Sequence, residues 1–308
     1  MLPILLKTLP FFALIGVGYW AGRVRFFSPE ATAYLTKFVF YFALSAMLFR
    51  FAANLSLAEI YSTRFVLAYL WGCGLVYAIA MGAAFLRGIS VEEAAIEAQC
   101  AVIGNTGFLG VPMLVMLMGP DAAGPVLMVL AIDLVVFSSL ITLIITGRRE
   151  GRMSLGLFRV LGIGLLKNPM IVSMVLGLAW SATGAEVPAP LNEFLALLGA
   201  AATPGALFAI GASLATKSAE RLAVAGWLSF CKLVLHPLAV GFAALVLFKV
   251  DARAASVMVA AAAMPVAGNV YILAQHYGVA PQRVSASILI STAISVVTVT
   301  GVIAWATA

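Results

Sequence analysis

The sequence predicts an all-α polytopic membrane protein in which ten transmembrane helices form two inverted five-helix repeats. Composition is the first observation behind this prediction: 64% of the 308 residues are hydrophobic and only 10% are charged, whereas a soluble domain has about 25% charged residues. The second is a mean hydropathy of +1.11 with repeated apolar runs of about 20 residues, the length that crosses a bilayer. The third is that one apolar run in each half of the chain is interrupted midway by Gly and Pro.

We expect the spans in ten apolar runs, which are residues 3–22, 34–53, 64–86, 92–118, 123–146, 168–183, 191–215, 221–248, 254–277 and 283–306. The longest hydrophilic stretch follows the fifth run and carries the basic residues Arg148, Arg149, Arg152, Arg159 and Lys167. The predicted domains are therefore a first five-helix repeat at 1–147, a cytoplasmic linker at 148–167 and a second, inverted repeat at 168–308.

Matching residues at a nearly constant offset support the two repeats. An offset of 159 residues pairs Pro10 with Pro169, Gly18 with Gly177 and Pro29 with Pro188, and an offset of 164 pairs Gly104-Asn105 with Gly268-Asn269. Because each repeat has an odd number of spans, the second must enter the membrane from the opposite side, which makes the repeats inverted.

Basic residues predict the orientation. Twelve of the 18 Lys and Arg residues lie on the side that includes the loop after the fifth span, five lie on the other side, and Lys232 lies within a span. The positive-inside rule then places that loop in the cytoplasm and both termini outside the plasma membrane, which in bacteria is the inner membrane. The net charge of +6 arises from these loops, and we expect no nucleic-acid partner.

Two short interruptions, residues 103–112 and 264–270, each combine a helix breaker with an asparagine preceded by glycine. Gly costs roughly 1 kcal/mol in a helix interior and Pro about 3 kcal/mol. Backbone freed from a helix inside hydrocarbon is tolerated only against protein or a water-filled cavity, and paired broken spans point to a transporter's binding site. The alternative is that both breaks are kinks that only improve packing.

We expect Pro112 and Pro265 in the first turns of two half-helices whose N-termini attract anions. Such a site could bind a carboxylate even though the site itself contains no formally charged side chain. The candidate substrate-binding residues are Gly104, Asn105, Thr106, Pro112, Pro265, Gly268, Asn269 and Tyr271.

Three further residues are candidates for ion coupling. Asp133 lies near the middle of the fifth span, where a charge is expensive and needs a partner. It is either a proton or sodium site or a structural pair with Lys232. Lys232 and His236 are four residues apart and share a helix face, although His236, next to Pro237, could instead bond backbone at a helix end.

Other patterns indicate structure rather than chemistry. Ser90 and Glu93 fit a capping box that opens the fourth span, and Glu97, one turn deeper, is either structural or lines an entrance. The three cysteines have no metal or redox spacing and are expected to be buried free thiols. No nucleophile–base or metal pattern is present in the sequence, so we expect neither an enzyme nor a metal or cofactor.

The two breaks resemble a known family. Asn105-Thr106-x-x-x-Gly110-x-Pro112 and Pro265-x-x-x-Asn269-x-Tyr271 are similar to the fourth and ninth spans of the auxin efflux carrier family. Lys232 to Pro237 also resembles the eighth span of its short prokaryotic members, and Thr203-Pro204 resembles the seventh. Ser45 stands where the family often has proline, and the central loop is short, which argues against auxin as substrate.

The resemblance implies a ten-span fold in which the broken helices 4 and 9 cross. It implies a scaffold at 1–60 and 168–218, a moving transport core at 61–147 and 219–308, and a homodimer. It also implies transport of organic anions such as dicarboxylates.

The sequence thus favours a secondary active transporter of small organic anions that works by alternating access, coupled to H⁺ or Na⁺ and embedded in membrane lipid. The competing hypothesis is a membrane channel or sensor that uses the same crossed helices without coupled transport.

Overall fold

The computed structural model describes residues 2–55, 61–150, 155–215 and 222–307. Within these ranges every regular element is a helix or helical turn, apart from one isolated β-bridge. The predicted all-α class is therefore confirmed.

The elements in chain order are α1 (Leu2–Arg23), α2 (Pro29–Phe38), η1 (Val39–Ala43), α3 (Leu44–Ala53), α5 (Thr63–Leu86), α6 (Val91–Val102), η2 (Thr106–Gly110), α7 (Val111–Met118), η3 (Pro120–Ala122), α8 (Ala123–Ile132), η4 (Asp133–Phe137), α9 (Ser138–Glu150), α10 (Leu155–Lys167), α11 (Pro169–Ser181), α12 (Ala189–Ala200), α13 (Ala202–Leu214), α14 (Leu222–Phe230), η5 (Cys231–Leu235), α15 (His236–Phe242), η6 (Ala243–Leu247), α16 (Ala252–Ala262), α17 (Gly268–Tyr277) and α18 (Pro281–Ala306).

Seven helical stretches of the described chain are long and apolar enough to cross a membrane, and the bent pair α10–α11 raises this number to eight. Two shorter apolar helices, Thr106–Met118 and Ala252–Ala262, belong to the fourth and ninth predicted spans. These are the spans that the sequence predicts to be broken, so each is divided into pieces that are too short to cross a bilayer alone.

Helices begin where the sequence supplies caps. Ser90 Oγ accepts a hydrogen bond from the Glu93 amide at 3.2 Å, and Glu93 Oε2 accepts one from the Ser90 amide at 3.4 Å. This reciprocal pair confirms the predicted capping box and fixes the start of α6. Asn168 caps α11 in the same way, since its side chain accepts from the Met170 amide at 3.0 Å.

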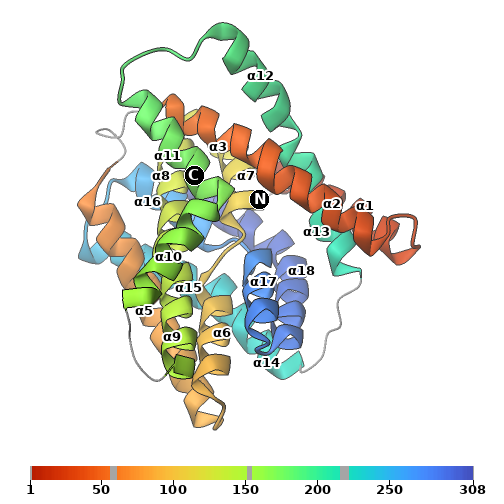
Figure 1. Cartoon of the computed structure of the whole chain (residues 1–308), viewed down its shortest axis with the longest axis vertical. Coiled ribbons are helices and arrows are strands. Elements are labelled where there is room, and N and C mark those ends of the chain that lie inside the picture. Colours follow the sequence, from red (N-terminus) through yellow and green to blue (C-terminus); the bar gives the residue numbers. More distant parts are fainter. Residues whose placement is uncertain (1, 56–60, 151–154, 216–221, 308) are drawn as a thin grey trace.

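Glycines allow one group of helices to pack with their backbones in contact. A Cβ atom at Gly18 of α1 would collide with the carbonyl of Phe208 in α13, and one at Gly177 of α11 would lie 2.6 Å from the carbonyl oxygen of Phe49 in α3. Small residues at helix contacts are typical of membrane bundles, where close approach maximises dispersion. Figure 1 shows α1, α3, α11 and α12 in its upper half.

A second group of helices borders both breaks, since α6 ends before the first break and α17 begins after the second. Figure 1 shows α5, α6, α9, α14, α17 and α18 in its lower half. The groups touch at α1 and α18, where the hydroxyls of Thr8 and Thr300 lie 2.9 Å apart.

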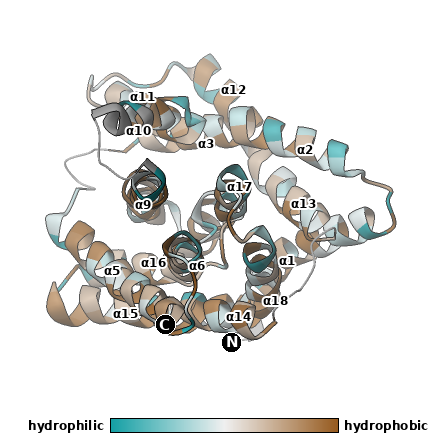
Figure 2. Ribbon diagram, turned by 60° about the horizontal axis from the view of Figure 1, so that its bottom comes forward, coloured by the Kyte–Doolittle hydropathy of each residue, from teal (hydrophilic) through white to brown (hydrophobic). Residues whose placement is uncertain are grey.

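Large apolar side chains cover much of the outer surface. Trp20, Phe26, Leu86 and Leu197 are each more than 60% exposed, and brown apolar residues dominate the outer helices in Figure 2. Such a surface is suited to contact with lipid rather than water.

The predicted linker at 148–167 is more regular than the sequence analysis expected. Helix α9 continues through Arg148 to Glu150, and α10 occupies Leu155–Lys167 before a bend of 76° into α11. The apolar residues between Arg159 and Lys167 explain this helix, because they allow a helical face to pack. Of the basic residues that predict orientation, Arg152, Lys217 and Arg221 lie outside the described residues.

Candidate functional site

The two breaks meet. Gly104 and Val266 form an isolated antiparallel bridge, in which the Asn105 amide donates to the Pro265 carbonyl at 2.7 Å and the Ala267 amide donates to the Ile103 carbonyl at 3.1 Å. The backbone groups that each break frees are thus paired with the other break. This pairing satisfies the requirement that buried backbone find partners away from water.

We call this contact between residues 103–105 and 265–267 the crossing. A helix begins directly after each of the two segments. Helix η2 begins at Thr106, and α17 begins at Gly268. The first amides of a helix have no partner inside it, and its N-terminus carries a partial positive charge. Two such termini therefore converge on one point of the protein.

The expectation for the prolines needs correction. Pro112 does stand at the start of α7, but the helical turn η2 precedes it, and Thr106–Met118 is one continuous apolar helix. The Gly110 amide bonds the Asn105 carbonyl five residues back, a wide turn that makes room for the proline ring. Pro265 lies in the extended segment before α17, where its carbonyl accepts from Asn105 rather than opening a helix.

Polar side chains at the crossing are buried and incompletely bonded. Asn105 is 6% exposed and Thr106 is 1% exposed. Thr106 Oγ1 and Asn269 Oδ1 have no hydrogen-bond partner among the described residues. Because buried polar atoms are nearly always paired in folded proteins, these two atoms mark a place where a polar ligand or water completes the site.

Lys232 supplies a formal positive charge that the sequence analysis did not expect at the crossing. Its Nζ lies 3.2 Å from the position that a Cβ atom at Gly104 would take. The ammonium donates to the carbonyl of Ala262, the last residue of α16, and lies 3.0 Å from His236 Nδ1. A cation there complements the negative end of α16.

His236 extends this polar cluster away from the crossing. Its Nε2 lies 3.0 Å from Cys73 Sγ, and its Nδ1 lies 3.1 Å from the Ala262 carbonyl. The sequence analysis allowed His236 to be a helix-end residue bonded to backbone, and His236 does begin α15 and contact a backbone carbonyl. That carbonyl belongs to α16.

Asp133 is buried in η4, and its Oδ1 accepts a hydrogen bond from the Tyr69 hydroxyl at 2.9 Å. Its Oδ2 has no hydrogen-bond partner among the described residues. The ion pairs of the described chain do not include Asp133 with Lys232. The Lys232 ammonium is directed at the Ala262 carbonyl instead, and the Asp133 and Lys232 charges interact without direct contact.

The remaining candidate substrate-binding residues differ in how closely their neighbours pack against them. A Cβ atom at Gly268 would meet nothing within 4 Å, in contrast to Gly104. Tyr271 lies one turn into α17, and its hydroxyl accepts from Gln275 Nε2 at 3.1 Å. Gly104 is therefore required by close packing, whereas Gly268 leaves open space at the start of a helix.

Residues 3–303 match the family described as "Membrane transport protein". The chain belongs to this family. It is 32% identical over 304 residues to a protein of Rhizobium meliloti (strain 1021) named "Putative malonate transporter", an alignment that covers 96% of this chain and 93% of that protein. It is 28% identical over 295 residues to "Uncharacterized transporter YfdV" of Escherichia coli (strain K12), covering 92% and 91%. The resemblance to auxin efflux carriers is confirmed at the level of the family.

The membrane transport protein also contains a charged cluster that the sequence analysis did not assemble. The fully buried Glu97 of α6 bonds Arg87, and its Oε1 accepts from Arg283 Nη1 of α18 at 2.9 Å. Arg283 Nη2 also lies 3.0 Å from Glu93 Oε1. Glu97 is thus structural in this arrangement, and it ties the first half of the fourth span to α18. Helix periodicity could not reveal this pairing, because Arg283 lies 186 residues away.

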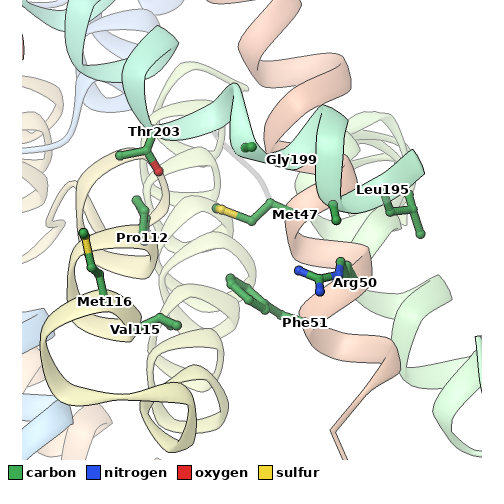
Figure 3. Close-up of a pocket in the computed structure, with 11 residues that line it drawn as sticks. Met47, Arg50, Phe51, Pro112, Val115, Met116, Leu195, Gly199 and Thr203 are labelled. Atoms are coloured by element: carbon green, nitrogen blue, oxygen red, sulfur yellow. The ribbon is translucent and has the colours of Figure 1, made fainter. Parts of the chain in front are cut away.

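A pocket of about 330 Å³ lies beside α7 and is lined in part by Pro112. Its lining residues are Met47, Arg50, Phe51, Pro112, Val115, Met116, Leu195, Ala196, Gly199, Ala200 and Thr203 (Figure 3). Of the residues that the sequence nominated, Pro112 alone is in this lining. Arg50 is one of the five basic residues that the orientation prediction counts on the outer side, and the sequence analysis gave it no other role.

Proposed function

We propose that this membrane transport protein is a secondary active transporter of small organic anions, with short dicarboxylates such as malonate as its substrates. The crossing carries the proposal: two helix N-termini begin there, Lys232 lies beside Gly104, and the buried Thr106 Oγ1 and Asn269 Oδ1 have no partner in the described chain. The name of the relative from Rhizobium meliloti, "Putative malonate transporter", is consistent with it.

The chemistry of the crossing suits a carboxylate. The amides at Thr106 and Gly268 point a partial positive charge toward the site, and the Thr106 hydroxyl can donate as well as accept. The Asn269 amide can present its NH₂ group by rotation about the terminal bond, since its oxygen and nitrogen are interchangeable in shape. Lys232 adds the full charge that balances one carboxylate.

We further propose a ten-span architecture of two inverted repeats for this chain. In it, α6–α7 and α16–α17 are the broken fourth and ninth spans, and α10–α11 contributes the sixth. The scaffold comprises 1–60 and 168–218, and the transport core comprises 61–147 and 219–308. The repeated asparagine–glycine breaks and the antiparallel bridge between them support this arrangement.

Alternating access requires the proposed scaffold and core to separate beside the crossing. Two apolar contacts now join them there. The rings of Phe40 and Phe108 stack with centroids 6.3 Å apart, and the Met170 Cε atom lies 2.5 Å from the position that a Cβ at Gly107 would occupy. Such contacts lack hydrogen bonds, so they can slide or part at low cost.

Asp133 is our proposed site for the coupled cation. It is buried, it retains one unbonded oxygen, and the groups around it include Tyr69, Cys73 and Lys232. An acidic side chain within a membrane span is expensive unless a cation or proton neutralises it during the cycle. Either H⁺ or Na⁺ would serve.

The test is malonate counterflow in proteoliposomes. A carrier preloaded with unlabelled malonate should accumulate labelled malonate transiently, and initial rates should saturate. Flux that rises linearly with concentration and shows no counterflow would contradict the proposal and indicate a channel. A parallel thermal-shift screen with malonate, succinate and the neutral malonamide, across pH and sodium, should show stabilisation by the acids alone, since ligands stabilise in proportion to occupancy.

A further inference from the structure

The pocket beside α7 contains an arginine held in position by its neighbour. Arg50 Nε donates to Asn192 Oδ1 at 2.9 Å, which ties the guanidinium of α3 to α12. Within the described chain, the two terminal nitrogens of Arg50 make no hydrogen bond or ion pair. We propose that this pocket is an accessory anion site in which Arg50 binds a short carboxylate before the anion reaches the crossing. The inference rests on the proposed function and names a second site along its route.

The remaining lining determines the class of ligand. Met47, Phe51, Val115 and Leu195 make most of the wall apolar, and the Thr203 hydroxyl adds one polar group (Figure 3). A guanidinium presents a planar fork that matches a carboxylate, and charge-assisted bonds of this kind are stronger than neutral ones. The apolar wall packs against the carbon chain of such an acid, and the half-buried guanidinium remains able to pair with its carboxylate. A volume of about 330 Å³ has room for a three- or four-carbon acid.

The position of the pocket connects it with the crossing. Pro112 lines the pocket and lies on the same helix as Thr106, six residues later. At about 1.5 Å per residue, the two positions are roughly 9 Å apart along the helix axis. The lining also comes from both proposed bodies, with α3, α12 and α13 from the scaffold and α7 from the core. Any relative movement of these bodies therefore changes the pocket.

Protection of an introduced cysteine tests the site without a transport assay. Thr203→Cys places a thiol in the lining, while the natural cysteines Cys73, Cys100 and Cys231 are buried. In purified full-length protein, malonate should slow maleimide labelling of Thr203→Cys at least threefold, and malonamide should not. Arg50→Gln should abolish the protection, and Arg50→Lys should retain part of it. The matched control Arg64→Gln, at an exposed arginine, should leave it unchanged.

Protection that persists in Arg50→Gln, or that malonamide reproduces, would overturn the proposal. So would protection by short-chain phosphatidylglycerol without protection by malonate, because the pocket would then hold a lipid headgroup. If Arg50→Gln is not monodisperse, Val115→Trp fills the pocket instead, and malonate should then give no further slowing.

One experiment distinguishes failure of the proposed site at the crossing from failure of the proposed site in the pocket. In an Asn105→Ala, Asn269→Ala background, malonate should still protect Thr203→Cys, even if transport is absent. Loss of protection in that background, with Arg50 intact and the protein folded, would show that the pocket has no anion site of its own.

Discussion

Replacing the side chains of Asn105 and Asn269 tests the proposed site directly. The crossing is held by the backbone of Asn105 and not by its side chain, so the replacement leaves the crossing intact. A hydrogen bond to a charged group contributes roughly 1.5–3 kcal/mol. Each Asn→Ala variant should therefore bind malonate about ten- to a hundredfold more weakly, with the melting temperature of the empty protein nearly unchanged. The two effects should not add, because both residues would contact one ligand.

Isothermal titration on purified single and double variants would provide this measurement. If the breaks are only packing kinks, the variants should be unstable, and their folded fraction should bind malonate normally. Unchanged affinity in both single variants would remove the crossing as the binding site.

A second prediction at the level of single residues concerns Asp133. Asp133→Asn keeps a hydrogen-bond acceptor for Tyr69 but cannot carry the charge that a coupled cation requires. We expect malonate counterflow to continue while the dependence of net uptake on the H⁺ or Na⁺ gradient disappears. Asp121→Asn, at an exposed aspartate of η3, is the matched control. A folded Asp133→Asn protein with the full gradient response would eliminate Asp133 as the coupling site.

At this scale the sequence identified the unusual residues but not their partners. Asp133 and Lys232 were recognised because charges are rare in apolar spans, and this argument needs no structure. Their contacts with Tyr69 and Ala262 could not be predicted, because periodicity gives the face of a helix and not the neighbour that it meets. Arg50 was missed for the same reason, since an arginine near the end of a span satisfies the orientation rule whether or not it lines a pocket.

Gly104 and Gly268, the two glycines at the breaks, should respond differently to replacement by alanine. A Cβ atom at Gly104 would lie 3.2 Å from Lys232 Nζ and 3.3 Å from Met264 Cβ, whereas one at Gly268 would meet nothing within 4 Å. Gly104→Ala should lower stability by about 1–3 kcal/mol through overpacking and weaken malonate binding by displacing Lys232. Gly268→Ala, in a helix, should be neutral or stabilising. Thermal unfolding of both variants in one detergent checks this, and equal destabilisation would contradict the geometry.

Helix α6 depends on a buried charge that α18 neutralises. Glu97→Gln should destabilise the protein by about 3 kcal/mol, because removing one partner of a buried ion pair leaves the other uncompensated. Glu92→Gln, at an acidic residue in the first turn of the same helix, should have little effect. Comparable unfolding temperatures for the two variants would show that the Glu97 cluster is not important for stability.

Element boundaries were predictable where capping chemistry fixes them. The Ser90 capping box is an example, since both partners lie within four residues. The restart of the fourth span at Thr106 was not predictable in this way. The wide turn before Pro112 is stabilised by the bridge to residues 265–267, and its pairing is set by a segment in the other half of the chain.

The whole molecule offers a test of the proposed orientation. Ala185→Cys, in the exposed loop between α11 and α12, should react with a membrane-impermeant maleimide added to intact cells. Gln282→Cys, at the exposed start of α18, should react only after the membrane is permeabilised. The reverse pattern would invert the proposed topology, and reaction of both from outside would contradict the ten-span arrangement.

The bridge between Gly104 and Val266 also has a consequence for biosynthesis. In the proposed ten-span arrangement, the broken fourth span enters the membrane with unpaired backbone amides and carbonyls, and their partners are encoded about 160 residues later. At roughly 5–20 residues per second, the ribosome needs on the order of 10–30 s to deliver them. During that interval the nascent fourth span must be sheltered by water, by the insertion machinery or by neighbouring helices. The centre of the protein is therefore the last part of the first half to mature, although it is synthesised early.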